Sequence, residues 1–373
     1  MRKLLLSTAL CTAVSAQAAV TVKHYGFVKA AYTQSDKTDG ASSGTEVAHK
    51  PFFAQDKDAS TDYEKEPKSY ITTTQSRWGM LANNGSKTSA RFEFDLDASQ
   101  SNGADSLSTA RIRQANIVYK PTENDVIEFG KKWSVFMGVL PHTKGFTRVY
   151  FWAGNSGFFT NGVDWTHSFG NTDLILDLSN TDNGDTSKDR TGYVDSPVTS
   201  AVINHTMGDH KFGIAYTSAQ LKQKELNSTY KNSNASGTKI YWAGKFDSLS
   251  VAAEYAMGSN LGSIQTGDLG KAATTTDDDI KTTAYFASLK YAGDAWAVYG
   301  GYGMNALDKE EEAGDGKVSK NQISTLGFDL TLDDGLTFFI EHNMFTTSFY
   351  RSSSDSSDDA NGSFTELGMV YVF

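Results

Sequence analysis

The chain has 373 residues and a formal net charge of −10, with 33 glycines, 12% aromatic residues and a single cysteine, Cys11. One cysteine excludes a disulfide framework and a thiolate metal site. After the first twenty residues no stretch approaches the ~18 consecutive apolar residues that a membrane-spanning helix needs. The acidic balance leads us to expect no nucleic-acid partner.

The first eighteen residues have the pattern of a secretory signal peptide. The start is basic (Arg2 and Lys3), an apolar stretch follows at 4–14, and the small residues of "AQA" (16–18) suit a cleavage site. We expect residues 1–18 to be removed, together with Cys11, and residues 19–373 to form a single domain. The alternative is a retained amphipathic anchor.

The remaining chain divides into about sixteen segments that alternate between apolar and polar side chains, as strands with two unlike faces do. In 88–98, for example, Phe92 and Phe94 face one way, whereas Glu93 and Asp95 face the other. The predicted strands are 20–33, 69–82, 88–98, 109–120, 126–133, 161–169, 172–180, 197–207, 210–218, 237–247, 249–258, 281–292, 295–304, 320–331, 335–346 and 362–373.

The connections between these strands alternate strictly between short and long. A soluble β-sandwich would also have alternating strands, but it has no reason to sort its connections by length. In lipid every backbone group must be paired, so a spanning sheet has to close, and such barrels have short turns at one end and long loops at the other. We therefore expect an all-β fold, a transmembrane antiparallel up-and-down β-barrel of 16 strands.

Four stretches resemble the sixteen-stranded trimeric porins of Gram-negative outer membranes. They are "KHYGFVKAAY" (23–32), "RIRQANIVY" (111–119), "EFGKKWSVFMG" (128–138) and the terminal aromatic residue. The region 109–138 is most similar to the DcaP-like porins, which are associated with small carboxylated solutes. The resemblance implies a homotrimer in the outer membrane, reached by Sec-type export, and a third long loop that folds into the barrel.

That loop, residues 134–160, has an unusual composition for a surface loop. It contains seven aromatic residues, Lys144 and Arg148, and no Asp or Glu. An exposed loop of this kind would promote aggregation, whereas a loop inside the barrel would not. By the resemblance we expect it to fold inward and form a constriction. A contact with another subunit or with a cell surface is the alternative.

The early strands place basic side chains on the face that we expect to line the lumen. An Arg or Lys that faces lipid at mid-membrane costs about 2–4 kcal/mol, so the lumen is the favourable side. A set of basic groups there would attract anions such as carboxylates. Each arginine could instead pair only with a carboxylate of the wall. The candidate pore-lining residues are Lys29, Arg77, Arg91, Arg111, Arg113 and Lys132, with Lys144 and Arg148 from the loop, and the acids Glu93 and Asp95.

The excess of acidic residues lies in the predicted long loops. We expect most of it to form a solvated outer face. A divalent cation that bridges these loops to lipopolysaccharide is the alternative, with "DDD" (277–279) as its candidate site. No other cofactor or metal site is expected.

The sequence carries none of the common catalytic motifs, such as Gly-x-Ser-x-Gly, His-Glu-x-x-His or a phosphate-binding loop. We expect a passive pore for small hydrophilic solutes and no enzyme activity. The alternatives are a cation-preferring or non-selective porin, and a plugged surface adhesin or structural barrel.

The last predicted strand ends on a large aromatic side chain. Leu367, Met369, Tyr371 and Phe373 share one face, which we expect to point away from the lumen. The pattern resembles the C-terminal signature by which the barrel-assembly machinery recognises its clients. We therefore expect Tyr371 and Phe373 to serve as an assembly signal.

Overall fold

A computed structural model describes residues 20–36, 38, 53–54, 56, 68–73, 75–97, 109–144, 150–180, 192–194, 196–224, 230–265, 267–270 and 279–373. The expected signal peptide (1–18) and Arg148 lie outside these residues. Among the described residues, no helix has the length and apolar character that crossing a bilayer would require.

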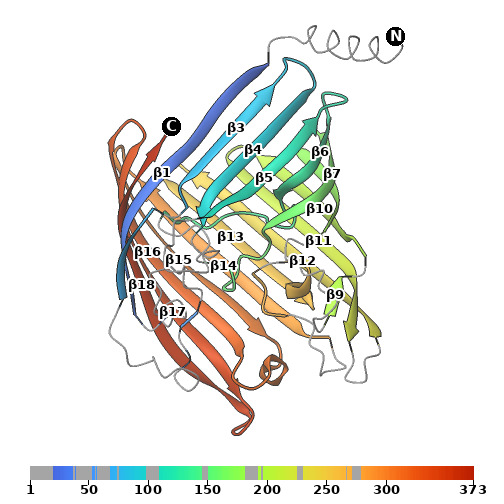
Figure 1. The fold of residues 1–373 in the computed structure, drawn as a ribbon, viewed down its shortest axis with the longest axis vertical. Helices are drawn as coiled ribbons and strands as arrows, with labels where there is room; N and C mark the ends of the chain where they lie inside the picture. The colour runs from blue at the N-terminus through green and yellow to red at the C-terminus, as the bar shows by residue number, and fades with distance from the viewer. Residues whose placement is uncertain are drawn as a thin grey trace, which may run out of the picture.

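The described residues form eighteen strand segments in one antiparallel sheet and two short 3-10 helices, η3 and η4 (Figure 1). The elements are β1 (Thr21–Asp36), β2 (Lys68–Thr72), β3 (Arg77–Asn83), β4 (Thr88–Asp97), β5 (Thr109–Tyr119), β6 (Asp125–Trp133), β7 (Phe159–Phe169), β8 (Thr172–Asn180), β9 (Gly192–Val194), β10 (Val198–Met207), β11 (His210–Lys224), β12 (Tyr230–Phe246), β13 (Leu249–Ser259), η3 (Leu261–Ser263), β14 (Lys281–Ala292), β15 (Trp296–Leu307), η4 (Glu310–Ala313), β16 (Val318–Asp333), β17 (Leu336–Arg351) and β18 (Ser356–Val372).

Two of the barrel strands are interrupted, which reduces the eighteen segments to sixteen strands. β2 and β3 pair with successive parts of β1, and β9 and β10 pair with successive parts of β11. The sheet closes because β1 also pairs with β18, from Phe27 opposite Val372 to Asp36 opposite Ser363. The predicted sixteen-stranded antiparallel barrel is confirmed.

The alternation of side chains assigns the two faces of the wall. In β18, Leu367, Met369 and Tyr371 are exposed on the outside, while Glu366 and Val370 are buried on the inside. Apolar side chains cover the outer face of the other strands in the same way, for example Ile340 in β17 and Leu326 in β16. A barrel that spans lipid needs such an apolar outer band.

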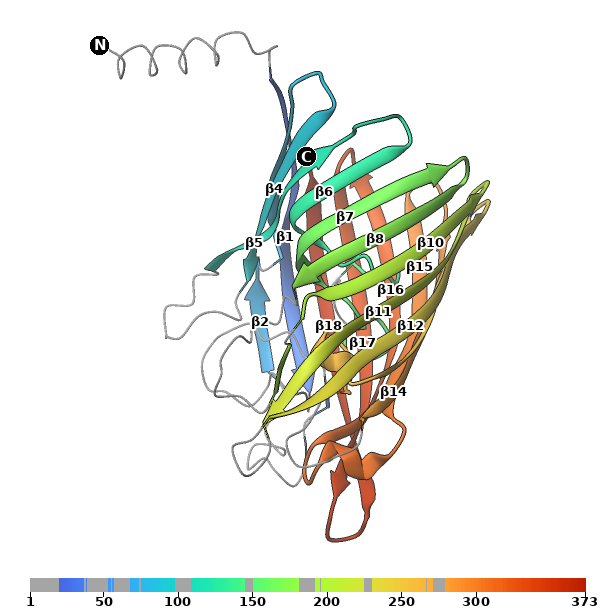
Figure 2. The ribbon, with the colours of Figure 1, turned by 90° about the vertical axis from the view of Figure 1, so that its right-hand side faces the viewer.

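Several strands are longer than the sequence predicted. β11 extends to Lys224, and β12 begins at Tyr230. Most of the expected loop 219–236 is therefore strand. Likewise β17 and β18 are joined by residues 352–355 alone, although 347–361 was expected to be a loop. In these extensions the apolar residues, such as Leu221 and Phe349, face inward, so no outward-facing apolar alternation marks them, while backbone pairing continues. The wall therefore extends much further at β16–β18 than at β4–β8 (Figure 2).

Candidate functional site: a constricted lumen

The third loop crosses the interior of the barrel. It leaves β6 at Trp133, and its described parts, 134–144 and 150–158, run through the inside of the barrel (Figure 1). The His142 N–H donates to the Ser288 hydroxyl of β14 at 3.1 Å, and the Lys144 N–H donates to the Glu341 carboxylate of β17 at 2.7 Å. The described loop residues thus span the lumen as expected.

Glycines in β15 allow the loop to approach the wall closely. A Cβ on Gly303 would lie 2.0 Å from the carbonyl oxygen of Ala153, and one on Gly301 would lie 2.5 Å from the Tyr150 hydroxyl. Tyr150 is buried against the Phe286 ring, with 5.7 Å between the ring centroids. The aromatic residues in the described parts of the loop are all buried or half-buried, so they are interior packing groups, which explains why a loop can carry so many.

A fully buried ion pair also holds the loop against the wall. The Lys239 ammonium of β12 lies 2.5 Å from a carboxylate oxygen of Glu254 in β13, and neither side chain is exposed. Lys239 also donates to the backbone carbonyl of Ser156 at 2.7 Å and lies 4.5 Å from the centre of the Phe136 ring. Two barrel strands and both halves of the loop thus meet at one charge pair.

A second segment folds inward, against the expectation from the sequence. Residues 259–280 were expected to belong to the solvated outer face, but within 260–270 Leu261, Ile264 and Asp268 are buried. The carbonyl oxygen of Gly267 accepts hydrogen bonds from the Trp152 N–H at 3.0 Å and from the Asn305 amide at 3.1 Å. For this part of the loop the expectation was wrong. The apolar Leu261 and Ile264 were the signal that could have revealed it.

Asp268 is the clearest case of an acid that is not solvated. Its Oδ1 accepts hydrogen bonds from the Gly270 N–H and the Thr282 hydroxyl, both at 2.9 Å, while its Oδ2 is buried without a hydrogen-bond partner among the described residues. Burial raises the pKa of the Asp268 carboxyl. Of the proposed cation site at 277–279, only Asp279 is described; it is exposed and accepts a hydrogen bond from Asn260 at 3.0 Å.

A cluster of arginines and carboxylates lies on the inner face of β3, β4 and β5. The strand register places Arg77, Asp95 and Arg111 side by side. Arg111 binds Asp95 with two hydrogen bonds, from Nε at 3.1 Å and from Nη2 at 2.8 Å. Arg113 donates to Asp95 and to Glu93, both at 2.8 Å. We call these residues, together with Arg91, the arginine wall.

A β-bulge at Arg113 allows both arginines of β5 to face the lumen along with the polar residues that follow them. Glu93 pairs with Gln114, and the next residue of β4, Phe94, pairs with Ile112, so Arg113 has no partner in the register. The extra residue reverses the alternation. Gln114 and Asn116 are consequently buried on the inside rather than exposed on the outside. A strict two-residue period along β5, without the bulge, would have placed them on the outer face.

Aromatic rings support the guanidinium groups of the arginine wall. Arg113 lies 4.7 Å from the centre of the Phe159 ring, Arg111 lies 5.7 Å from Phe158, and Arg77 lies 5.2 Å from Phe27. Arg113 is 2% exposed, whereas 22% of the Arg111 side chain is exposed. Arg111 is therefore the more accessible of the two to a solute in the lumen.

The other candidate residues differ in accessibility. Lys29 is buried in an ion pair with Glu366, and Lys132 is buried 2.8 Å from Asp177 and 3.5 Å from Asp164. Their charges are compensated and shielded from the lumen. Arg91 is half-buried and donates to Gln114 at 3.1 Å, and Lys144 is half-buried on the loop.

A second polar group lies across the lumen and was not identified from the sequence. Glu341 accepts a hydrogen bond from the Tyr299 hydroxyl at 3.1 Å in addition to that from Lys144. Lys290 lies 3.6 Å from Asp329. Burial and the nearby Lys290 lower the pKa of His142, which favours its neutral form. These residues come from different strands and a loop, so only the register of the closed barrel brings them together.

No protein-family model and no curated protein sequence matches the chain. Solved structures match over nearly the whole chain. The outer membrane channel DcaP of Acinetobacter baumannii is 17% identical, with 95% of this chain and 97% of that chain covered and a TM-score of 0.76. The anion-selective porin from Comamonas acidovorans is 12% identical, with 95% and 100% covered and a TM-score of 0.61. OmpT of Vibrio cholerae is 13% identical, with 95% and 98% covered and a TM-score of 0.57. The chain thus has the sixteen-stranded barrel fold of the outer-membrane porins, and the expected likeness to DcaP is confirmed at the level of the fold.

Proposed function

We propose that the protein is an outer-membrane porin through which small hydrophilic solutes diffuse passively, with a preference for anions such as small carboxylates. The observation that supports this most is the composition of the arginine wall, in which four guanidinium groups accompany two carboxylates. The Comamonas relative is described as anion-selective, which agrees with the proposal. No covalent step is involved, and the protein acts as a selective path and not as an enzyme.

Selectivity would arise from the field of the arginine wall. Fixed charges of one sign, set in a lumen with low-dielectric walls, raise the local concentration of the opposite ion. Arg111 is held by Asp95 on one side and lies beside the Phe158 ring on the other. Its orientation is therefore fixed before a solute arrives, and its planar fork suits a carboxylate.

A cation-preferring porin is the second candidate, and the neighbouring sector of the wall favours it. There Lys132 is accompanied by Asp164 and Asp177, and Glu128 pairs with Asp164 across β6 and β7. In this sector the carboxylates outnumber the ammonium group. The charge of the wall thus changes sign between β5 and β6, and the measured preference depends on which sector the solute path follows.

Reversal potentials across a planar bilayer with a salt gradient test the proposal. The purified protein should show open-channel steps and a reversal potential of the sign that anion preference gives. Arg111→Gln should reduce this preference, whereas Lys281→Gln, which changes an exposed lysine on the outward face of β14, should not. A clear cation preference would exclude the anion-selective reading, and a complete lack of channel steps would favour a plugged barrel.

We also propose that the protein forms a homotrimer in the outer membrane of a Gram-negative bacterium, after Sec-type export and insertion by the barrel-assembly machinery. One form of the Vibrio relative is described as a trimer, which supports the oligomeric state. Cross-linking of the protein in isolated outer membranes, compared with a heat-dissociated sample, would test both the location and the number of subunits.

A further inference from the structure

A second group of basic residues lies on the inner face of β11, β12 and β14, at the end of the barrel where β1 begins and β18 ends (Figure 1). The strand register brings the group together, because Lys245 pairs with Ser250 and Ser250 pairs with Lys290. Lys211 pairs with Ala243, two residues from Lys245, and such diagonal neighbours lie within reach of long side chains. We call Lys211, Lys245 and Lys290 the lysine row.

The lysine row lies directly beyond the third loop, on the side of the short turns. The loop covers Tyr241 of β12, because a Cβ on Gly138 would lie 2.2 Å from that ring. It also covers Ser288 of β14, whose hydroxyl accepts a backbone hydrogen bond from the loop at 3.1 Å. On the same face, Lys245 and Lys290 follow four and two residues closer to the short turns. A solute that leaves the constriction on this side therefore meets the lysine row next.

The lysine row keeps most of its positive charge. Within the described ranges, Lys211 and Lys245 make no ion pair, and the Lys211 ammonium lies 5.7 Å from the centre of the Tyr241 ring. Lys290 lies 3.6 Å from Asp329, and 31% of its side chain is exposed. The row thus differs from the buried lysines of β1 and β6, whose charges are compensated by close carboxylates.

The carboxylates at this end of the barrel stand around the row and not within it. Asp173 of β8 and Asp329 of β16 face the lumen on its two sides, and Asp209, Asp247 and Asp294 are exposed in the turns. From β10 to β15, the described inner face between the loop and the turns carries no acid. Fixed charges of one sign in a lumen with low-dielectric walls concentrate the opposite ion. The row therefore attracts anions to one sector of the exit.

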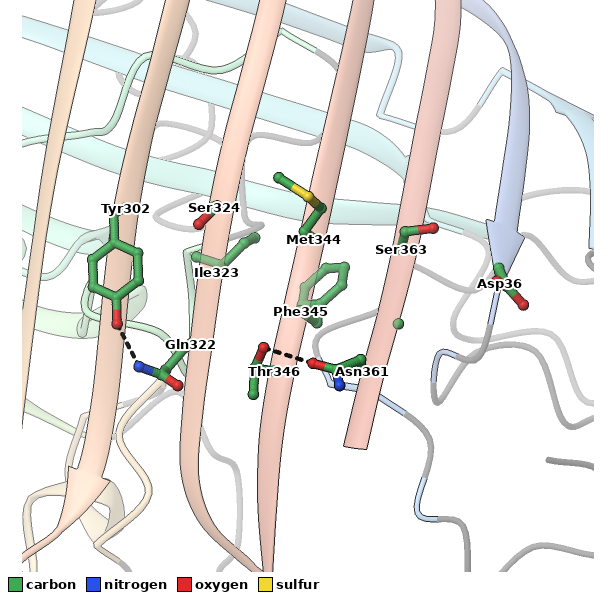
Figure 3. Close-up of a pocket in the computed structure, with 11 residues that line it drawn as sticks. Asp36, Tyr302, Gln322, Ile323, Ser324, Met344, Phe345, Thr346, Asn361 and Ser363 are labelled. Carbon is green, nitrogen blue, oxygen red and sulfur yellow. Dashed lines mark hydrogen bonds between the residues drawn. The ribbon is translucent and has the colours of Figure 1, made fainter. Parts of the chain in front are cut away.

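The outer face of the neighbouring strands offers an anion no comparable site. A groove of about 520 Å³ on the outside of β15–β18 is lined by amides, hydroxyls and apolar groups (Figure 3). Asp36 is the one charged residue among the described residues that line it. An anion would meet no cation there, whereas Lys290 of β14 faces the lumen.

An ammonium group holds an anion differently from the guanidinium groups of the arginine wall. It is a compact charge with rotatable donors, and it lacks the planar fork that binds a carboxylate in two contacts. Between Lys245 and Lys290, the hydroxyl of Ser250 adds one more donor. Conduction requires binding that is strong enough for entry and weak enough for release. The lysine row has the chemistry of a release site.

We propose that the lysine row and the Ser250 hydroxyl form a second anion site, which takes a carboxylate or phosphate group as it leaves the arginine wall and releases it toward the short turns. The inference rests on the proposed porin function. It assigns selection to the arginine wall and release to the lysine row. The arginine wall therefore sets the reversal potential, whereas the row makes block by an added anion depend on the side of addition.

Sulfate, added to one side of a planar bilayer in potassium chloride, tests the proposal. Its half-blocking concentration should be lower from the short-turn side than from the long-loop side. Lys211→Gln/Lys245→Gln should raise the short-turn value about tenfold, because two charged contacts are lost. In a separate preparation, Lys317→Cys, modified from one chamber with a bulky thiol reagent, identifies the long-loop side, where this residue is exposed.

A matched control is Lys120→Gln/Lys281→Gln, which also removes two exposed lysines, one at the β5–β6 turn and one on the outward face of β14. It should be blocked as the unchanged protein is. An equal rise in the control would overturn the proposal and identify general surface charge as the cause. Equal block from both sides of the unchanged protein would also overturn it.

A second measurement does not depend on conduction. Crystals soaked in selenate should show an anomalous peak at the lysine row that Lys211→Gln/Lys245→Gln loses, and the absence of this peak from the unchanged protein would contradict the site. A peak in a protein that shows no channel steps, or that prefers cations, would support the site and refute the proposed function.

Discussion

Asp95 is the residue on which the arginine wall depends. Its two carboxylate oxygens bind Arg111 and Arg113, and it is 1% exposed. A buried carboxylate that pairs with two guanidinium groups both holds them in place and cancels part of their charge. The arrangement therefore sets the position of Arg111 and limits the strength of its field.

Replacement of this carboxylate should separate the two effects. In Asp95→Asn the guanidinium charges lose a compensating charge, so we expect the reversal potential to shift toward stronger anion preference, opposite to the shift of Arg111→Gln. The barrel should also lose about 3–5 kcal/mol of stability, because one partner of a buried ion network is removed. Bilayer recordings and urea unfolding of the same sample measure both. A shift toward cations would show that Arg111 needs Asp95 to stay in the path.

Asp268 should make the stability of the barrel depend on pH. Because burial raises the pKa of its carboxyl in the folded state, the folded chain binds this proton more tightly than the unfolded chain. The free-energy cost of burying the ionised group is absent below the ordinary pKa of a carboxyl, about 4. This cost grows as the pH rises through the raised pKa of the folded state. Asp268→Asn should therefore raise the free energy of unfolding by about 1–3 kcal/mol at neutral pH and have little effect near pH 4.

Asp315→Asn provides a control of opposite sign. Hydrogen bonds from Ser352 lower the pKa of this exposed carboxyl, so its contribution to stability is present at neutral pH and is lost as pH falls through the lowered value. Urea unfolding between pH 3 and pH 8 gives the difference in the free energy of unfolding between each variant and the unchanged protein. With rising pH this difference should increase for Asp268→Asn and decrease for Asp315→Asn. A pH-independent gain for Asp268→Asn would mean that packing, and not ionisation, is responsible.

At the scale of the element, the strands were predictable because the outer band must be apolar and the lumen polar. That rule identifies β4, β13 and β14 almost to the residue. It does not reach the ends of β11, β12, β17 and β18 on the side of the long loops, where the outer face no longer alternates with regular apolar residues and backbone pairing defines the strand. It also fails where the period itself changes, as at Arg113.

The buried pair of Lys239 and Glu254 should control how firmly the third loop is held. Lys239→Met leaves Glu254 buried without its partner and removes the hydrogen bond to Ser156, so we expect a loss of about 3–5 kcal/mol and frequent closures in single-channel recordings. Lys239→Met/Glu254→Gln removes both charges and should recover most of the stability. If the single variant conducts as steadily as the unchanged protein, the loop is held by its aromatic packing and not by the pair.

At the scale of the whole molecule, the closure of the barrel determines which residues meet in the candidate site. The sequence could place Arg77, Arg91, Arg111 and Asp95 on one face of their strands, but not in contact. Contact requires the register between β3, β4 and β5, which backbone hydrogen bonds across the sheet determine. Likewise, Glu341 and Lys144 are 197 residues apart and meet only because the barrel closes around an inward loop. A pattern along the chain carries no information about such distances.

The closing seam itself allows the two roles of Phe373 to be separated. Its backbone N–H and C=O exchange hydrogen bonds with Gly26, both at 3.1 Å, and a Cβ on Gly26 would lie 3.0 Å from its ring. Phe373→Ala keeps the backbone bonds and loses the ring, whereas deletion of Phe373 loses both. If the ring is an assembly signal, Phe373→Ala should reduce insertion in cells, leave export intact, and refold normally from urea into detergent.

The variant that lacks Phe373 should refold more slowly than Phe373→Ala in the same experiment. Its seam between β1 and the chain end lacks the two backbone hydrogen bonds to Gly26, which the assembly machinery cannot replace. The amount of heat-modifiable barrel on unboiled gels measures refolding, and the amount in isolated outer membranes measures assembly. Poor refolding of Phe373→Ala in detergent would mean that the ring is needed for closure, since Gly26 then leaves an unfilled space beneath it. In that case recognition by the assembly machinery would not be required to explain a defect in cells.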